Sequence, residues 1–422
     1  MIELQPGKEV ELTDGKKAAI VKELGRGGQG IVYLVNIEGK NKALKWYLNP
    51  MGDSFYKNLE WNVHNGAPSD AFLWPENLTV RYRNGHYGYV MALRPSNYRE
   101  FSNYLLARVK FKSFRAIMAA AIKICDGFMM LHRSGYSYQD LNDGNFFIDP
   151  DTGDVLICDN DNVMPQGEKS GIMGKARYMA PEIVAGGVPD KYSDRFSLSV
   201  ILFMLFFGNH PLEGAKVAAC PCLTEAYEKK FYGREAVFIY DPVRNSNRPV
   251  LGVHRNVIRR WPIFPELLRD TFMQQFSEER LKKRESRLIE SEWRKIIIKT
   301  RDMLVRCPHC GEETFINTST HKCMNCGNDI DDTRRLNIGD RTICLVPGSG
   351  LFIDSDNLPD ARVFISPADA SMFLVQNITD GQWTAETPSG KIKQVDPKGY
   401  IPVKKGIKIS FSATSTGELV TL

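Results

Sequence analysis

The stretch Tyr138-Gln139-Asp140-Leu141-Asn142-Asp143-Gly144-Asn145 decides the fold of this 422-residue chain. Before it, residues 114–132 carry apolar side chains at helical spacing and predict a helix with a broad buried face. After it come two short predicted strands, 145–148 and 155–158, and then Asp159. One aspartate, an asparagine five positions later and a second aspartate beyond another strand suit phosphoryl transfer. One carboxylate can take a hydroxyl proton, while the remaining oxygens hold Mg²⁺ on phosphates.

A glycine-rich stretch lies upstream, close to the first predicted strands. In a dinucleotide-binding fold such glycines end a strand and open a helix. Here residues 31–35 continue as a strand, which favours a hairpin that can cover a phosphate chain. An ordinary glycine-rich turn is the alternative. The residues that fit G-x-G-x-x-G-x-V are Gly25, Gly27, Gly28, Gly30 and Val32.

A lysine on the next predicted strand strengthens the phosphate interpretation. Lys45, within residues 42–46, can neutralise the α- and β-phosphates of a nucleotide. It needs an acidic partner, and Glu60 is the natural one if residues 56–63 form a helix. Glu76 is the rival partner.

In this order, the glycine-rich stretch, Lys45, Asp140 with Asn145, and Asp159 resemble the Hanks-type, or eukaryotic-like, protein kinases. The later stretch Gly174-Lys175-Ala176-Arg177-Tyr178-Met179-Ala180-Pro181-Glu182 extends the resemblance, which covers about residues 10–300. It implies an α+β, bilobal kinase fold, with lobes at 1–94 and 95–303. It also implies transfer of the ATP γ-phosphoryl group to a protein hydroxyl, with a serine/threonine preference.

The resemblance assigns a role to each candidate residue. Asp140 would accept the proton, and Lys45 would bind the α/β-phosphates with Glu60 as its partner. Asn145 and Asp159 would hold Mg²⁺. The backbone of residues 91–93, Met91 to Leu93, would meet adenine at the hinge, with Met91 as the gatekeeper, and Gly25 to Gly30 would cover the nucleotide. Arg287 would pair with Glu182.

Several positions depart from the family pattern. Gln139 replaces an arginine that contacts phosphorylated activation loops, so switching by loop phosphorylation is not expected to follow the common route. Asn142 stands where a lysine is often found, and Asn160 replaces the phenylalanine after the metal-binding aspartate. Lys175 stands where serine/threonine kinases usually carry a threonine. These changes leave a second hypothesis, a pseudokinase scaffold that acts through weak nucleotide binding and its C-terminal modules.

Four of the nine cysteines form two matched C-x-x-C-G motifs, Cys307 with Cys310 and Cys323 with Cys326. Two thiolates from each of two tight turns predict a closed tetrahedral zinc site, and metal binding should drive the folding of this ribbon, residues 304–332. His309 and His321 are possible substitutes for a thiolate. The odd total of cysteines argues against a disulfide framework.

The C-terminal part predicts a β-sandwich over residues 335–422. Its strand-like runs, separated by turns, are residues 342–346, 350–353, 361–365, 372–377, 383–387, 400–403 and 408–411. Residues 377–383 and 399–406 resemble later strands of forkhead-associated domains, although that family's phosphothreonine motifs are not evident. At the end of the kinase-like part, before the cysteine motifs, residues 265–305 predict one charged helix. The layout resembles bacterial kinases of tellurite-resistance-type gene clusters, which implies a phosphatase and a von Willebrand-type protein as partners.

Composition sets the remaining expectations. The net charge of +5, from 55 Lys+Arg against 50 Asp+Glu, disfavours a nucleic-acid partner, and the basic residues around the ribbon are interleaved with acids. The longest apolar run, residues 200–207, is far shorter than the roughly 20 residues of a membrane span. Nothing near the first residue resembles a signal peptide, so we expect a soluble, cytoplasmic protein.

Overall fold

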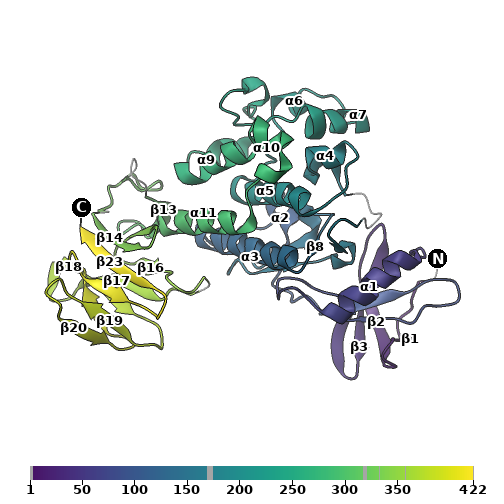
Figure 1. Ribbon diagram of the computed structural model, residues 1–422, viewed down its shortest axis with the longest axis horizontal. Helices are drawn as coiled ribbons and strands as arrows, with labels where there is room; N and C mark the ends of the chain where they lie inside the picture. Colours follow the sequence, from purple (N-terminus) through teal and green to yellow (C-terminus); the bar gives the residue numbers. More distant parts are fainter. Residues whose placement is uncertain (1–2, 169–173, 317–320, 332, 357, 422) are drawn as a thin grey trace.

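The computed structural model describes residues 3–168, 174–316, 321–331, 333–356 and 358–421. Figure 1 shows a strand-rich N-terminal lobe with one prominent helix, then a helical lobe, then a β-rich end. The N-terminal lobe and the β-rich end lie on opposite sides of the helical lobe (Figure 1).

The N-terminal lobe is an antiparallel sheet in the order β1-β2-β3-β4-β6-β5. Side chains alternate between the two faces of a strand. In β4, Leu44 and Trp46 therefore join the hydrophobic cluster on one face, while Ala43 and Tyr47 join the cluster beneath α1. Lys45 projects on the same side as α1. The bounds are β1 (Glu9–Glu11), β2 (Lys17–Arg26), β3 (Gly30–Ile37), β4 (Lys40–Tyr47), α1 (Asp53–Asn65), β5 (Asn77–Leu78) and β6 (Gly88–Met91).

The helical lobe is built around α5 (Lys191–Phe207), which is buried along most of its length. Asp190 caps its first turn by accepting hydrogen bonds from the backbone N–H groups of Tyr192 and Ser193, and Gly208 ends it in the left-handed conformation. The predicted helix over 114–132 is confirmed as α3 (Phe114–Arg133), which packs against α5 and α11 (Glu290–Asp302).

The remaining elements of this lobe are short, and they place the loops of the candidate site. In the described part of the chain, no helix has the length and apolar composition to cross a membrane. The short elements are β7 (Arg99–Glu100), α2 (Phe101–Leu105), β8 (Tyr136–Ser137), η1 (Asp143–Asn145), β9 (Phe146–Ile148), β10 (Val155–Ile157), η2 (Asn160–Asn162), β11 (Met164–Pro165), η3 (Ala176–Tyr178), α4 (Pro181–Val184), α6 (Ala215–Ala218), α7 (Glu225–Glu228), η4 (Lys229–Arg234), η5 (Asn245–Asn247), α8 (Arg255–Arg260), α9 (Glu266–Gln275), α10 (Glu278–Lys282) and η6 (Arg284–Ser286).

The prediction of one charged helix over residues 265–305 is wrong. The segment forms α9, α10, η6 and α11 in succession. The hydroxyl of Ser277 accepts the backbone N–H of Arg280 and so starts a new helix at α10. Before α11 the chain is extended at Arg287, whose buried guanidinium binds both carboxylate oxygens of Glu182 at 2.7 and 2.8 Å. The predicted pair between Arg287 and Glu182 is therefore confirmed.

After α11 the chain forms a β-hairpin of β12 (Leu304–Arg306) and β13 (Glu313–Phe315). Phe315 belongs to the hydrophobic core of the helical lobe, where its ring centre lies 5.4 Å from that of Phe114 and 5.2 Å from that of Phe264. A separate small cluster joins the cysteine segment to Cys344 in the β-rich end. The hairpin thus contacts both of its neighbours.

The β-rich end consists of two sheets that enclose one hydrophobic cluster. The first sheet has the order β15-β14-β23-β22-β19-β20 and the second β16-β17-β18-β21. Sequence analysis missed β14, β20 and β23, in which polar and charged residues alternate with few apolar ones. The bounds are β14 (Arg334–Ile338), β15 (Arg341–Cys344), β16 (Gly350–Leu351), β17 (Ala361–Ser366), β18 (Asp369–Asn377), β19 (Trp383–Glu386), β20 (Ile392–Val395), β21 (Tyr400–Pro402), β22 (Lys408–Ser410) and β23 (Thr416–Thr421).

Ion pairs dock the β-rich end on α11. Arg341 of β15 donates two hydrogen bonds to the buried carboxylate of Asp302, at 2.7 and 2.9 Å. Asp356 accepts a hydrogen bond from Arg301 at 3.1 Å and another from Arg294. Charge-assisted hydrogen bonds of this kind fix geometry as well as adding energy.

Candidate active site and cysteine cluster

The glycine-rich stretch is the turn of the β2–β3 hairpin, as the strand pattern predicted. Gly25 pairs with Val32 across the hairpin. A Cβ on Gly30 would lie only 2.5 Å from the backbone oxygen of Trp46, so only glycine fits there. A Cβ on Gly25 or Gly28 would meet nothing within 4 Å. The space beside these two glycines is therefore open to a ligand.

Lys45 is almost fully buried, and two carboxylates hold its ammonium group. Its Nζ lies 2.8 Å from Asp161 Oδ2 and 3.2 Å from Asp159 Oδ1. Burial by itself lowers the pKa of Lys45, but the negative charges of Asp161 and Asp159 outweigh that effect and raise the pKa above its ordinary value. Lys45 is therefore a cation, the state in which a lysine can bind phosphate.

The predicted ion pair between Lys45 and Glu60 is wrong. Residues 56–63 are helical, as expected, but Glu60 is exposed. The buried face of α1 instead presents Asn58 and Asn62, whose amide nitrogens bind the backbone oxygen of Val163 at 2.8 and 3.2 Å. Successive helical residues turn by about 100°, so Glu60 points about 200° away from Asn58.

Asp161 is the acidic partner that sequence analysis missed. Its carboxylate is fully buried and also accepts a hydrogen bond from Tyr47 Oη at 2.6 Å. The rival partner, Glu76, pairs with Lys42 at 2.7 Å. The sequence feature that could have revealed this partner is the second acid of Asp159-Asn160-Asp161, which stands where the family pattern has a glycine.

Asp140 and Asn145 lie in one loop that backbone contacts hold in place. Asn145 donates its Nδ2 to the backbone oxygen of Asp140 at 2.8 Å. The buried carboxylate of Asp194, in α5, accepts the backbone N–H groups of Tyr138 at 2.6 Å and Gln139 at 3.2 Å. The loop is thus anchored to the core of the helical lobe.

The environment of Asp140 changes its acidity. Burial raises the pKa of Asp140 to about 6, against a hydrogen bond from Asn142 that lowers it; the nearby charge of Asp159 raises it further. A carboxyl group with this pKa is largely ionised at neutral pH and can accept a proton.

Asp159 occupies the left-handed region, with φ 55°, and its side chain is 47% exposed. Asn160 follows it and is fully buried. The Nδ2 of Asn160 donates to the backbone oxygens of Leu73 at 2.8 Å and Ile157 at 2.9 Å. Hydrogen bonds to the backbone therefore hold the turn that carries Asp159, where the family pattern places an apolar ring.

The two remaining candidate positions lie at the end of β6. Met91 is buried and pairs with Ala43 of β4. Leu93 lies just beyond the strand and is 37% exposed. Met91 thus ends β6, and Leu93 lies on the chain that leads from β6 to β7; their role at an adenine-binding hinge stays a prediction.

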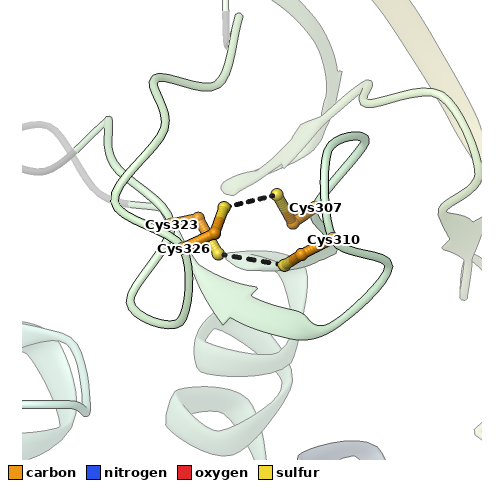
Figure 2. Close-up of side chains that lie close together, drawn as sticks. All are labelled: Cys307, Cys310, Cys323 and Cys326. Carbon is orange, nitrogen blue, oxygen red and sulfur yellow. Dashed lines mark hydrogen bonds between the residues drawn. The ribbon is translucent and has the colours of Figure 1, made fainter.

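The four cysteines of the two C-x-x-C-G motifs converge, as Figure 2 shows. Cys307 Sγ lies 3.7 Å from Cys326 Sγ, and Cys310 Sγ lies 3.7 Å from Cys323 Sγ. Four sulfurs at about 2.3 Å from one Zn²⁺ ion would be about 3.8 Å apart. All four ligand atoms lie within 4.8 Å of one another, so the cluster has the size of a tetrathiolate zinc site.

The turns of both motifs favour metal binding by the thiols. Gly311 and Gly327 have φ of 76° and 74°, which glycine adopts without strain. Backbone N–H of Glu312 and the amide of Asn325 donate to Cys310 and lower the pKa of its thiol to about 6. Among the described residues, the group of possible metal ligands at this place contains the four cysteines and neither histidine.

Comparison with known proteins finds similarity in the part of the chain that carries Asp140 and Asp159. Residues 73–231 match the family described as the protein kinase domain. The chain is 31% identical to mouse (Mus musculus) protein kinase C delta type over 206 residues, which cover 46% of this chain and 29% of that protein. It is 29% identical to the serine/threonine-protein kinase Pkn1 of Myxococcus xanthus over 215 residues, or 47% of this chain and 30% of that protein.

The match therefore spans less than a third of the length of these curated relatives. Among solved structures, vaccinia related kinase 3 is similar with a TM-score of 0.50 and 16% identity, over 70% of this chain and 90% of that chain. This likeness concerns the fold. Residues 73–231 are thus similar to a protein kinase domain, and the proteins that resemble this part of the chain include serine/threonine kinases.

Proposed function

We propose that this protein is a serine/threonine protein kinase that transfers the γ-phosphoryl group of ATP to a protein hydroxyl. One observation carries the proposal: Lys45, Asp140, Asn145 and Asp159 lie in one connected site. Lys45 contacts Asp159 at 3.2 Å, and Asn145 contacts the backbone of Asp140 at 2.8 Å. The backbone N–H of Cys158, next to Asp159, donates to the oxygen of Asn145 at 2.8 Å and links the two loops.

Each side chain has a task in this reaction. Asp140 takes the hydroxyl proton of the substrate, and Lys45 binds the α- and β-phosphate oxygens. The open side of Gly25 and Gly28 lets backbone N–H groups approach the phosphates. The chain around Met91, with Gly27, Gly30, Val32 and Leu93, forms the walls of the nucleotide site.

The residues present fit a magnesium ion. Asn145 commits its amide nitrogen to the backbone, which leaves its Oδ1 as the atom to face a cation, and the carboxylate of Asp159 is half exposed. Such oxygen donors are those that Mg²⁺ prefers. When bound, the ion neutralises charge on the transferred phosphates. Lys45 and Asp161 keep their own contact at 2.8 Å, so Asp159 can be shared between Lys45 and the metal.

The pseudokinase alternative rests on the departures at Gln139, Asn142 and Asn160. The contacts of these residues support an enzyme instead. Gln139 donates to Ser137 Oγ at 3.0 Å and to the backbone of Glu168 at 2.6 Å, and Asn160 holds the Asp159 turn. These residues differ from the family pattern but still hold the site in place, which favours an active kinase over a pseudokinase.

Magnesium-dependent phosphorylation tests the proposal. The full-length protein is incubated with labelled ATP and casein, and the wild type is compared with Asp140→Ala and Asp159→Ala. We expect both variants to lose at least about 100-fold in kcat, the scale of a lost general base or a lost metal ligand. Asp140→Ala at the wild-type rate, in protein that melts like the wild type, would sink the assignment. The pseudokinase hypothesis predicts nucleotide binding with no transfer.

We further propose that Cys307, Cys310, Cys323 and Cys326 bind one structural Zn²⁺ ion in a zinc ribbon. The sulfur separations of 3.7 Å and the absence of another described ligand in the group support a closed site. Elemental analysis of the purified protein should find one zinc per chain, and none in the Cys310→Ser/Cys323→Ser variant.

The last proposals concern the C-terminal end and the cellular setting. The two-sheet arrangement of residues 334–421 supports a β-sandwich related to forkhead-associated domains that serves recognition. By the layout of its modules, the protein belongs to cytoplasmic bacterial kinases of tellurite-resistance-type clusters. A protein substrate, a cognate phosphatase and a von Willebrand-type protein are its expected partners. Co-purification from cells that express all three proteins tests this placement.

A further inference from the structure

The catalytic loop lacks a positive charge of its own near Asp140. Asn142 occupies the position where the resemblance places a lysine, and it is buried. Yet a lysine reaches the same place from another segment. Lys175 Nζ donates a hydrogen bond to Asn142 Oδ1 at 3.1 Å, and it lies 3.9 Å from Asp143 Oδ1.

A short relay connects this lysine to the carboxylate of Asp140. Asn142 accepts from Lys175 through its Oδ1 and donates from its Nδ2 to Asp140 Oδ1 at 3.3 Å and to the backbone oxygen of Asp140 at 3.2 Å. A hydrogen bond from an ammonium group fixes which way an amide points and strengthens the bond that the amide donates. The backbone N–H of Gly144 also donates to Asn142 Oδ1, at 3.0 Å. Lys175 and Gly144 therefore orient the Asn142 amide together, and Lys175 is the charged one of the two donors.

The backbone next to Lys175 is also close to Asp140. A Cβ added to Gly174 would lie 3.2 Å from Asp140 Oδ1 and 3.4 Å from the backbone oxygen of Gln139. The absence of a side chain at Gly174 thus lets this segment run against the catalytic loop. This approach brings the start of the following residue, Lys175, within reach of Asn142.

We propose that Lys175 is a positioning residue that supplies, from the segment before η3, the positive charge that Asn142 removes from the catalytic loop. The inference deepens the proposed function and rests on it. Lys175 orients Asp140 through Asn142 and places a cation beside the hydroxyl acceptor. Relative to the family pattern, which has a lysine in the loop and a threonine at 175, the lysine has moved from position 142 to position 175.

An exchange of residues tests this inference directly. The variants are Lys175→Ala, Lys175→Thr, Lys175→Arg and the double variant Asn142→Lys/Lys175→Thr. Lys229→Ala is the matched control, because the Lys229 side chain is 63% exposed and that of Lys175 is 60% exposed. The readouts are kcat on casein, the dissociation constant of Mg-ADP and the thermal midpoint of the full chain.

We expect Lys175→Ala and Lys175→Thr to lower kcat about 10- to 100-fold, because the lost charge would act on the phosphoryl group during its transfer. The affinity for the nucleotide should stay within about twofold of the wild type. Lys175→Arg keeps a cation and should retain most of kcat. The double variant should regain at least about tenfold over Lys175→Thr. Lys229→Ala should match the wild type.

Each contrary result has its own meaning. An active wild type with unchanged kcat in Lys175→Ala overturns the role of Lys175 and leaves the proposed function intact. A double variant that melts like the wild type but is no faster than Lys175→Thr also overturns it. If the double variant unfolds, equal losses in Lys175→Arg and Lys175→Ala overturn it. A wild type without Mg-ATP-dependent transfer overturns the proposed function and this inference together.

Discussion

Asp161 Oδ2 lies 2.8 Å from Lys45 Nζ, and both side chains are buried. The acid that holds Lys45 therefore comes from the loop of Asp159 and not from α1. Helix α1 contacts the same loop further along, where Asn58 and Asn62 bind the backbone oxygen of Val163. The charge of Lys45 is thus balanced without a carboxylate on α1.

Asp161 should matter to nucleotide binding far more than Glu60 does. In Asp161→Asn, Lys45 retains only Asp159, which it must share with a metal, so we expect kcat/KM for ATP to fall about 100-fold. Breaking a buried ion pair also costs about 3–5 kcal/mol of stability. Glu60→Gln removes an exposed charge and should leave kcat/KM within about twofold.

Steady-state kinetics and thermal melting check this pair of variants. Equal losses in Asp161→Asn and Glu60→Gln would contradict the assignment of Asp161. A double variant no worse than Asp161→Asn alone would support it.

The cysteine cluster should stabilise the helical lobe as well as the ribbon. Phe315, on the hairpin beside Cys310, packs between Phe114 and Phe264. Removing the metal with a strong chelator, or introducing Cys310→Ser, should therefore lower the thermal midpoint of the whole chain. Differential scanning fluorimetry measures the shift, and Cys222→Ser, at an exposed cysteine outside the cluster, is the control. An unchanged midpoint in zinc-free protein would refute the coupling.

His132 should make stability fall at alkaline pH. Its Nδ1 lies 2.9 Å from Glu290 Oε1 and its Nε2 3.1 Å from Asp194 Oδ2. Burial by itself lowers the pKa of His132, but the hydrogen bonds to Asp194 and Glu290 raise the pKa from 6.5 to about 9. The folded pKa is above the unfolded one, so the stabilisation is complete below about pH 6.5 and disappears as pH rises through about 9.

The measurement is the thermal midpoint of the wild type and of His132→Gln from about pH 6 to about pH 10. The difference between the two proteins should shrink as pH rises. A difference that is constant over this range would show that His132 is not charged in the folded protein.

Arg341 should hold the β-rich end against the helical lobe. In Arg341→Ala the carboxylate of Asp302, which is 5% exposed, loses both of its charge-assisted hydrogen bonds. We expect a loss of about 3–5 kcal/mol and faster proteolysis between the two parts. Urea unfolding and limited trypsin digestion measure these effects, with the exposed Arg362→Ala as the control. A digestion pattern identical to that of the wild type would argue against the docking role.

Local patterns made much of the site predictable. Asp140, Asn145 and Asp159 lie within 20 residues and are separated by strands short enough to recognise, and the cysteine spacing is local as well. The partner of Lys45 was not predictable from such patterns, because it depends on which face of α1 turns inward and on a contact with Asp161 across 116 positions. The breaks within residues 265–305 escaped notice because tertiary contacts, such as that of Arg287 with Glu182, override helical periodicity.

The position of Phe315 limits how short a stable fragment with the candidate site can be. A fragment that stops at Asp302 would contain each residue proposed for catalysis, yet Phe114 and Phe264 would lose the ring that covers them and face water. Exposing one buried phenylalanine side chain to water costs about 1.5–3 kcal/mol of folding free energy. A stable fragment that carries the candidate site should therefore extend past residue 303, the predicted end of the lobe, at least through Phe315.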